Sequence, residues 1–244
     1  FFKHKTAYEI PLRLVGSEMC IRDRLKRLRK CFKKIERIIV KRESKDSRIL
    51  NIISLAEKNS IAINFDKTKR FEAYFYPREM EDINFLEKNI IRKKDPLLVV
   101  LDHIQDPQNL GSILRSSLGA SVDAVIIPKD RACHLTPTVR KVSKAASEII
   151  PVIVVSNLRN TVKILKNYSV EIYACSGEAN KCYFDVDFKG PKALIFGSEE
   201  KGIQKFLANE ANGQIKIPID SRLESLNVSN ATSVILFEAK RQRN

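Results

Sequence analysis

The chain has 244 residues, 43% of them hydrophobic and 30% charged, which is enough to bury one large core or two modest ones and excludes a disordered or fibrous chain. Its longest apolar stretches, such as Leu97–Leu101 and Val122–Ile127, run for five or six residues, far short of the roughly 20 that a membrane-spanning helix needs. A formal net charge of +15, from 44 Lys and Arg against 29 Asp and Glu, favours nucleic acid as a partner.

The first residues look foreign to the rest of the chain. The run Leu14–Arg24, LVGSEMCIRDR, resembles a translated sequencing adapter. Residues 1–24 also lack the apolar region and small-residue cleavage site of a signal peptide. We therefore expect residues 1–24 to be a non-native segment that takes no part in the fold.

Residues 25–80 are predicted to form a small α/β domain. Hydrophobic patterning predicts a strand at Ile35–Val40, an amphipathic helix at Asp46–Asn59 and a second strand at Ile61–Phe65. This order is a β-α-β unit. We interpret it as an RNA-binding domain.

The basic residues are concentrated in the N-terminal part of the chain. Residues 1–96 carry a net charge of +11, against +4 for residues 97–244. Arg22–Arg48 alone contains 13 Lys or Arg and only four acidic residues, a density that suits contact with RNA phosphates. A solvated lysine-rich surface is the alternative interpretation.

Residues 81–96 are interpreted as a linker, because their pattern is polar and Pro96 disfavours a helical conformation at Asp95. Beyond it, strands and helices alternate. The predicted strands are Leu97–Leu101, Val122–Ile127, Pro151–Val155, Val170–Ala174, Ala193–Phe196 and Gln214–Ile217. The predicted helices are Gly111–Leu118, Thr138–Ile149, Leu158–Tyr168, a segment after Gly202, and Val228–Arg241. This alternation predicts a parallel sheet covered on both faces, whose ligands bind beyond the carboxyl ends of the strands.

Neither a metal site nor a nucleotide-binding loop is expected. The cysteines are Cys20, Cys31, Cys133, Cys175 and Cys182, with no CxxC pair. Together with three scattered histidines, they predict reduced thiols, no metal and a cytoplasmic protein. The eight glycines form neither GxGxxG nor GxxxxGK[ST], so hydride transfer and ATP hydrolysis are disfavoured.

Three polar segments follow predicted strand ends. In the first, LDHIQDPQNLGSILRS, Asn109 could cap the helix that contains Arg115. Taken alone, this segment is also typical of a capped helix with a solvated arginine. His103, in the same segment, is interpreted as a structural or surface residue.

The second segment is IFGSEEKG, in which Gly197 would allow another backbone or a ligand to come close. Glu199 could bind a ribose hydroxyl, a cation or a helix N-terminus. A plain turn is the alternative. The third segment, IPIDSRLESLNVSNA, places Ser225 and Asn227 before the last helix, where helix capping is the alternative.

In this order, the three segments resemble the motifs of the SpoU (TrmH-like) branch of the SPOUT RNA methyltransferases. The matched positions are Asp106, Pro107, Asn109, Gly111 and Arg115 for DPxNxGxxxR; Gly197, Glu199 and Gly202 for GxExxG; and Ile217, Pro218, Ser225–Ser229 and Ala231 for IP with SLNVSxA. The resemblance covers residues 97–244. Within the family it is strongest to enzymes that methylate the 2′-oxygen of a guanosine in large-subunit (23S) ribosomal RNA.

The resemblance implies an α/β fold in which a parallel-sheet SPOUT domain with a trefoil knot, residues 97–244, follows a small and incomplete RNA-binding domain. It implies S-adenosyl-L-methionine as the cofactor and a homodimer as the working form. The implied cofactor-binding residues are Gly197, Ile217 and Leu226. The implied catalytic residues are Arg115, Asn109, Glu199, Ser225 and Asn227, of which Arg115 would deprotonate the ribose hydroxyl. Because a guanidinium normally stays protonated, we interpret Arg115 instead as a group that orients the ribose and stabilises charge developing on its oxygen.

Two other functions remain open. One is a tRNA 2′-O-methyltransferase of the same family, and the other is a catalytically silent protein that binds RNA or assists ribosome assembly. The long N-terminal region favours ribosomal RNA, and the complete set of motif residues favours activity.

Overall fold

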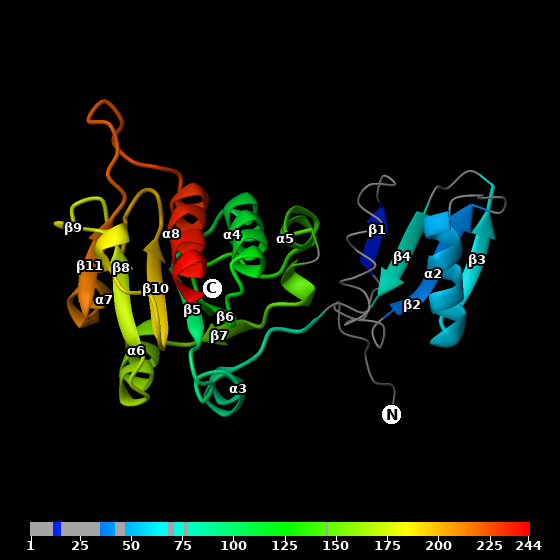
Figure 1. The fold of residues 1–244 in the computed structure, drawn as a ribbon, viewed down its shortest axis with the longest axis horizontal. Coiled ribbons are helices and arrows are strands. Elements are labelled where there is room, and N and C mark those ends of the chain that lie inside the picture. Colours follow the sequence, from blue (N-terminus) through cyan, green and yellow to red (C-terminus); the bar gives the residue numbers. More distant parts are fainter. Residues whose placement is uncertain (1–11, 16–34, 42–46, 68–70, 76–77, 145) are drawn as a thin grey trace. The chain divides into compact units, whose positions relative to one another are not determined.

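The computed structural model describes residues 12–15, 35–41, 47–67, 71–75, 78–144 and 146–244. The chain forms two compact units, Phe1–Glu79 and Met80–Asn244 (Figure 1). No helix of the described residues is long and apolar enough to cross a membrane.

The first unit contains the predicted β-α-β unit. Strand β2 (Ile35–Lys41), helix α2 (Ser47–Lys58) and strand β3 (Ala62–Asp66) follow one another, and β2 pairs in parallel with β3. The prediction for these three elements is therefore confirmed. Among the described residues of this unit, the buried apolar ones are Ile38, Val40, Ile49, Ile52, Ala56 and Ile61, so α2 closes a small core against the sheet.

Two further strands complete this sheet. Strand β4 (Phe71–Phe75) pairs antiparallel with β2, and β1 (Leu12–Val15) pairs antiparallel with β4 at the sheet edge. The expectation that residues 1–24 take no part in the fold was wrong for Leu12–Val15, whose alternating LRLV pattern suits an edge strand. The rest of that segment, and most of the basic stretch Arg22–Arg48, lie outside the described residues.

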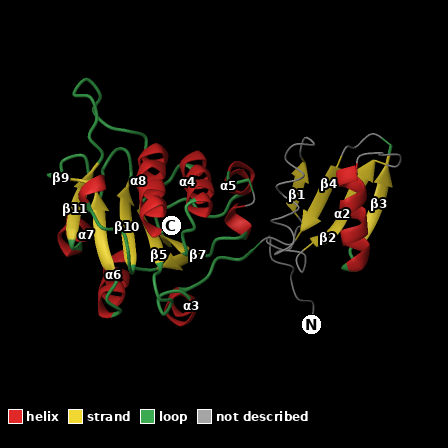
Figure 2. Cartoon of the chain, viewed as in Figure 1, coloured by secondary structure: helices red, strands yellow, loops and turns green. Residues whose placement is uncertain are grey.

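The second unit is built on the predicted parallel sheet. Its seven strands lie in the order β7-β6-β5-β10-β8-β11-β9, and every pairing is parallel (Figure 2). The strands are β5 (Leu97–Asp102), β6 (Ala124–Pro128), β7 (Val152–Val155), β8 (Glu171–Cys175), β9 (Lys181–Cys182), β10 (Lys192–Gly197) and β11 (Gly213–Lys216). The expected trefoil knot remains a prediction.

Helices cover both faces of this sheet. They are α3 (Ile83–Asn89), α4 (Pro107–Gly119), α5 (Pro137–Val142), α6 (Leu158–Asn167), α7 (Lys205–Glu210) and α8 (Val228–Arg243), with 3₁₀ turns η3 (Ala146–Glu148) and η4 (Tyr183–Asp185). Alternate residues of β5 join two separate cores, one shared with α4, α5 and α8 and the other with α3, α6 and α7. The prediction of two covered faces is confirmed.

The expected linker 81–96 is part of the second unit. Glu81 pairs with the edge strand β7 through its backbone, with N–O distances of 2.8 Å to Val152 and Val154. Helix α3 follows, and Leu86, Ile90 and Ile91 are buried against the sheet. These three apolar side chains explain why the segment packs instead of bridging two units.

The predicted helix Thr138–Ile149 is interrupted. Helix α5 ends at Val142, Lys144 takes a left-handed conformation with φ +51°, and the 3₁₀ turn η3 follows. A buried ion pair between Arg140 and Glu148 joins the two pieces. The break brings Val142 close to α4, where a Cβ on Gly111 would lie 2.6 Å from the Val142 Cβ. Gly111 is therefore a packing requirement.

The end of α8 is fixed to the sheet by Arg243. Its guanidinium donates hydrogen bonds to the backbone oxygens of Phe188 (2.8 Å), Asp95 (2.9 Å) and Gly190. Burial lowers the pKa of this group from its usual value. One side chain thus ties the last helix to the segments that precede β5 and β10.

Replacement of this arginine should destabilise the second unit. We expect Arg243→Ala to lower the free energy of unfolding by about 2 kcal/mol, because three carbonyl groups lose a charged donor. Thermal unfolding followed by circular dichroism measures the effect. Arg241→Ala is the matched control, since Arg241 pairs with Glu238 on the exposed side of the same turn. Equal melting temperatures for the two variants would contradict the assignment.

Candidate active site

The three motif segments meet at the carboxyl edge of the sheet, where a hydrogen-bond network joins them. Oε1 of Glu199, in the loop after β10, accepts from Nδ2 of Asn109 on α4 (3.3 Å) and from Nδ2 of Asn227 before α8. The backbone N–H of Val228 points to the same oxygen at 3.4 Å. Nδ2 of Asn227 also donates to Oδ1 of Asn109 (3.0 Å). A single carboxylate thus holds two helices that are far apart in the sequence.

Asn109 does not cap α4, contrary to the sequence-based suggestion. Asp106 is the N-cap, and its carboxylate accepts from the backbone N–H groups of Gln108 (3.0 Å) and Asn109 (3.2 Å). Pro107 occupies the first turn, where a missing N–H costs nothing. Because the cap is supplied by Asp106, the buried Asn109 side chain is available to Glu199.

Asn227 combines both roles considered for it. Its Oδ1 caps α8 by accepting from the Ser229 backbone N–H (2.9 Å) and hydroxyl (2.6 Å). Its Nδ2 simultaneously reaches Glu199 and Asn109. Negative charge beside a helix N-terminus is favourable, so Glu199 also suits its place at the start of α8.

Gly197 is required by the close return of its own loop. The backbone N–H of Gly202 donates to the Ser198 oxygen (2.8 Å), and Gly202 has φ +62°. A Cβ built on Gly197 would lie 2.1 Å from the Gly202 carbonyl carbon. The sequence suggested that either another backbone segment or a ligand comes close to Gly197. The Gly202 backbone is close enough to require glycine at this position without any ligand.

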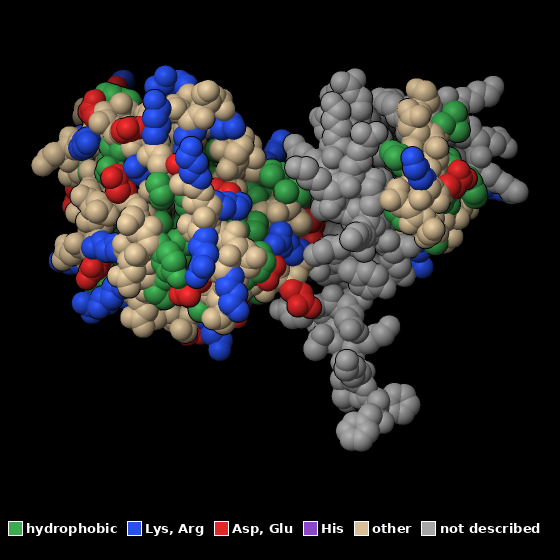
Figure 3. All heavy atoms as spheres, turned by 60° about the horizontal axis from the view of Figure 1, so that its bottom comes forward, with side chains coloured by type: hydrophobic (Ala, Val, Ile, Leu, Met, Phe, Trp, Pro, Cys, Tyr) green, Lys and Arg blue, Asp and Glu red, His purple; other side chains and the backbone are tan. Residues whose placement is uncertain are grey.

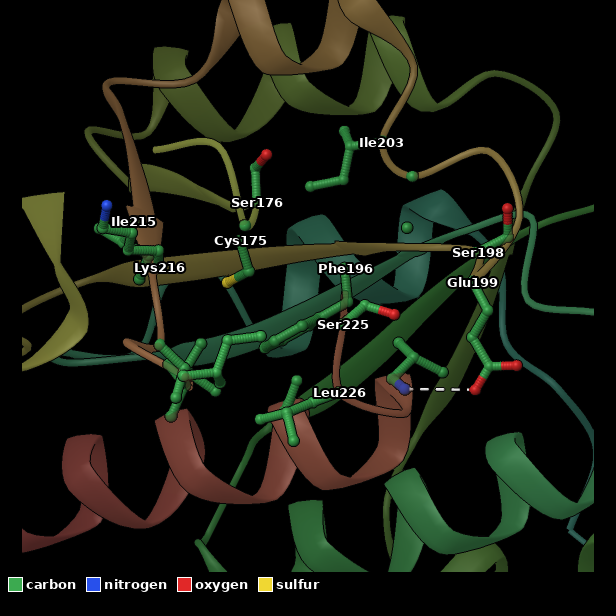
Figure 4. A pocket seen from close by; sticks show the side chains of 18 of the residues that line it. Cys175, Ser176, Phe196, Ser198, Glu199, Ile203, Ile215, Lys216, Ser225 and Leu226 are labelled. Atoms are coloured by element: carbon green, nitrogen blue, oxygen red, sulfur yellow. Dashed lines mark hydrogen bonds between the residues drawn. The ribbon is translucent and has the colours of Figure 1, made fainter. Parts of the chain in front are cut away.

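A cavity opens beside this network, between the ends of β8, β10 and β11 and the segment that leads to α8. Five of the predicted residues, Gly197, Glu199, Ile217, Ser225 and Leu226, line it. Figure 4 shows Ser225 and Leu226 near Cys175 and Phe196, with Glu199 hydrogen-bonded at one side. Residues that sequence reasoning missed complete the walls: Cys175, Ser176, Phe196, Ile203, Ile215, Lys216, Ile219 and Glu224.

The walls of this cavity are apolar and its rim is polar. Burial raises the pKa of the Cys175 thiol well above its usual value, so this side chain is a neutral wall and not a nucleophile. Ser176, Ser198, Ser225 and Glu224 supply hydroxyl and carboxylate groups. An apolar cleft with a few polar groups is typical of a small-molecule site.

The segment between β11 and α8 is shaped by a local ion pair. Arg222 donates to both carboxylate oxygens of Asp220 at 2.9 Å, and these bonds lower the pKa of Asp220 to about 2. The Leu223 backbone N–H closes the turn onto the Asp220 oxygen (3.0 Å). Ser225 and Leu226 follow this turn directly.

Arg115 lies apart from the cavity and the network. It projects from the exposed side of α4 and makes no hydrogen bond or ion pair within the described part of the chain. Two apolar residues of the adjacent helix α8 are exposed as well, Val234 (39%) and Phe237 (52%), and the Phe237 ring lies over Gly119. The structure therefore brings together the other seven predicted site residues, but not Arg115.

The described residues contain no group of three or more His, Cys, Asp or Glu that could hold a metal ion.

Comparison with known proteins places the second unit in a family. The model of the SpoU rRNA Methylase family matches residues 96–237. The 23S rRNA (guanosine-2′-O-)-methyltransferase RlmB of Pseudomonas putida is 33% identical over 223 residues, which is 86% of this chain and 90% of that protein. RlmB of Xanthomonas axonopodis pv. citri is 44% identical over 147 residues, and the match spans 59% of that protein's length and 60% of this chain.

Solved structures share the fold. The SpoU methyltransferase AviRb from Streptomyces viridochromogenes, in complex with the cofactor AdoMet, superposes with a TM-score of 0.75 at 19% identity and covers 96% of this chain and 90% of its own. The A. aeolicus TrmH/SpoU tRNA modifying enzyme has a TM-score of 0.56 at 27% identity, over 63% of this chain and 78% of its own.

The glycine requirement is testable by a matched pair of variants. Gly197→Ala should lower the free energy of unfolding by about 2 to 3 kcal/mol, because the new methyl group collides with backbone atoms that cannot move independently. Gly177 lines the same cavity, but a Cβ there would meet nothing within 4 Å. Gly177→Ala should therefore leave the melting temperature nearly unchanged. If the two variants melt alike, the loop is not sterically closed at Gly197.

Proposed function

This chain belongs to the SpoU rRNA methylase family, and on that basis we propose that it transfers a methyl group from S-adenosylmethionine to the ribose 2′-oxygen of a guanosine in 23S ribosomal RNA. The observation that carries the proposal is the joining of all three motif segments, through Asn109, Glu199 and Asn227, at the rim of one cavity.

Ribosomal RNA is favoured over transfer RNA by the extent of the similarity. RlmB of Pseudomonas putida, which is named for 23S rRNA, aligns over 86% of the chain, whereas the tRNA modifying enzyme matches 63% of it. Lys and Arg side chains are spread over the visible face of the second unit in Figure 3 and are not gathered in a single patch. We infer that the first unit contributes to RNA affinity. Because ribosomes assemble in the cytoplasm, we place the activity there.

The residues that line the cavity suit the chemistry of S-adenosylmethionine. Ile217 and Leu226 offer apolar walls, and Ser176 and Ser225 offer hydroxyl groups. Lys216 and Glu224 place opposite charges on the same rim, which suits the zwitterionic amino-acid end of the cofactor. When bound, the cofactor supplies an electrophilic methyl group on a positively charged sulfur.

The remaining catalytic tasks fall to side chains of this protein. A ribose hydroxyl must be held in line and relieved of its proton, so positioning and charge stabilisation are the main requirements. A guanidinium is suited to orient the ribose and to stabilise charge on its oxygen. We assign this role to Arg115. Glu199, with Asn109 and Asn227, acts as a positioning group that fixes the cavity rim.

The exposed position of Arg115 is explained by a homodimer. Val234 and Phe237 form an apolar strip on α8 next to α4, and such strips mark protein contacts. A two-fold contact through α4 and α8 would cover them and direct Arg115 toward the partner's cavity. We propose that each working site combines residues of two chains.

The activity itself is tested with labelled S-adenosylmethionine. We expect label in 23S rRNA, as a 2′-O-methylguanosine, after incubation with separated ribosomal and transfer RNAs. Label in tRNA alone would establish the tRNA alternative. Absence of label from both would support a silent RNA-binding protein.

The role of Arg115 has its own test. Arg115→Ala should lower kcat by at least about 100-fold, as loss of a charge-stabilising group does, while calorimetry finds cofactor affinity nearly unchanged. Arg159→Ala is the control, because Arg159 stacks over Phe206 on the opposite face of the sheet. Full turnover by Arg115→Ala would remove this residue from the mechanism.

A mixing experiment tests the shared site. Arg115→Ala and Leu226→Glu chains, each inactive alone, should regain activity when mixed, because each mixed dimer contains one site with both groups intact. A monomeric elution profile for active protein, or no recovery in verified heterodimers, would contradict the shared site.

A further inference from the structure

A second cavity adjoins the first across the Glu199 loop. It is bounded by the loop after β5, by Arg131 and by the segment after β10. Ser198, Glu199, Gly202 and Val228 line both cavities, so this loop is their common wall. Asp106 and Asn109 of the first motif also line it, but neither the motifs nor the network described above accounts for Asp102, His103, Gln204 and Arg131.

His103 is held in this cavity by a buried carboxylate. Asp102 is only 1% exposed, and its Oδ1 lies 2.5 Å from Nδ1 of His103 and 2.7 Å from Nε2 of Gln204. Its Oδ2 accepts from the Gln204 backbone N–H (2.7 Å). Nδ1 of His103 also lies 2.9 Å from Nε2 of Gln204. Because an ionised carboxylate only accepts hydrogen bonds, we place the Nδ1 proton toward Asp102. In the neutral imidazole that carries this proton, Nε2 is an acceptor.

This Nε2 atom has no hydrogen-bond partner among the described residues, and the His103 side chain is 21% exposed. His103 also has φ +58°, a conformation that is uncommon for residues other than glycine. The interpretation of His103 as a structural or surface residue explains neither feature. A fixed imidazole with a free nitrogen instead indicates a ligand contact.

Three other charged side chains line this cavity, those of Arg131, Glu200 and Lys201. Arg131, also left-handed at φ +54°, is exposed at the cavity. Its loop is tied to the His103 loop by a hydrogen bond from the Cys133 backbone N–H to the Ile104 oxygen (2.8 Å). Glu200 lines the cavity from the Glu199 loop. The cavity thus presents a guanidinium, a carboxylate and an imidazole acceptor.

We propose that this second cavity binds a guanine nucleotide of the RNA substrate and that His103, fixed by Asp102, is its hydrogen-bonding anchor; the inference rests on the proposed function. A guanine edge has two adjacent acceptors, which match Arg131, and adjacent N–H donors, which match a carboxylate or imidazole acceptor. A methyl acceptor also has to reach the donor cavity, and the shared wall provides that proximity.

The first test is the KM for RNA of two His103 variants. His103→Asn keeps a donor for Asp102 and tolerates the left-handed backbone but lacks the distal nitrogen. His103→Gly removes the whole ring and relaxes the backbone, which protects folding. Loss of one hydrogen bond predicts an increase in KM of about five-fold or more in both, with kcat and cofactor affinity within about two-fold. An unchanged KM in an otherwise active enzyme would overturn the proposal.

The second test does not depend on activity. Guanosine 5′-monophosphate should shift the imidazole NMR signals of His103, identified by their absence from His103→Asn. Adenosine 5′-monophosphate and inorganic phosphate should shift them less. Equal shifts from either compound, or none from guanosine 5′-monophosphate, would overturn the assignment to guanine. If the chain methylates no RNA but these selective shifts appear, the proposed function fails and the cavity assignment stands.

Discussion

The architecture of the site depends on one carboxylate. Glu199 accepts hydrogen bonds from Asn109 and Asn227, which belong to helices on either side of the motif-two loop in sequence. An ionised carboxylate in this position satisfies two side-chain amides and faces the start of α8. The loop that carries Glu199 is also the common wall of two cavities. The hydrogen bonds of Glu199 therefore fix both the contact between α4 and α8 and the position of the wall between the two cavities.

Sequence patterns predicted the sheet and most of the site for physical reasons that are easy to identify. Buried parallel strands are short apolar runs, and the three motifs carry their polar residues at strand ends. Predictions failed where tertiary contacts decided the outcome. Lys144 breaks a helix whose pattern continues, and Leu86 anchors a segment that is polar overall. Asn109 was predicted as a possible helix cap, but Asp106, three residues earlier, is an equally good capping residue and occupies that position. Cavity residues such as Cys175 and Lys216 follow no pattern, since strand pairing alone brings them to the rim.

The motifs also mix two kinds of requirement. Gly111 leaves space for Val142, and Gly197 leaves space for the Gly202 backbone. These two motif residues are therefore required by packing. Asn109, Glu199 and Asn227 form the network, whereas Arg115 makes no hydrogen bond or ion pair within the described residues. A match to the complete motif therefore contains more evidence about the fold than about the chemistry, and the two have to be tested by different variants.

The network has a further consequence for how the protein folds. Its hydrogen bonds connect residues that are 90 and 118 positions apart in the chain, and the central pairing of β5 with β10 is similarly remote. Contacts between distant residues carry a large loop-closure entropy and form slowly. We therefore expect the catalytic unit to fold slowly and its site to be completed late. In partly folded chains, α4 and α8 would be formed before the hydrogen bonds among Asn109, Glu199 and Asn227 connect them.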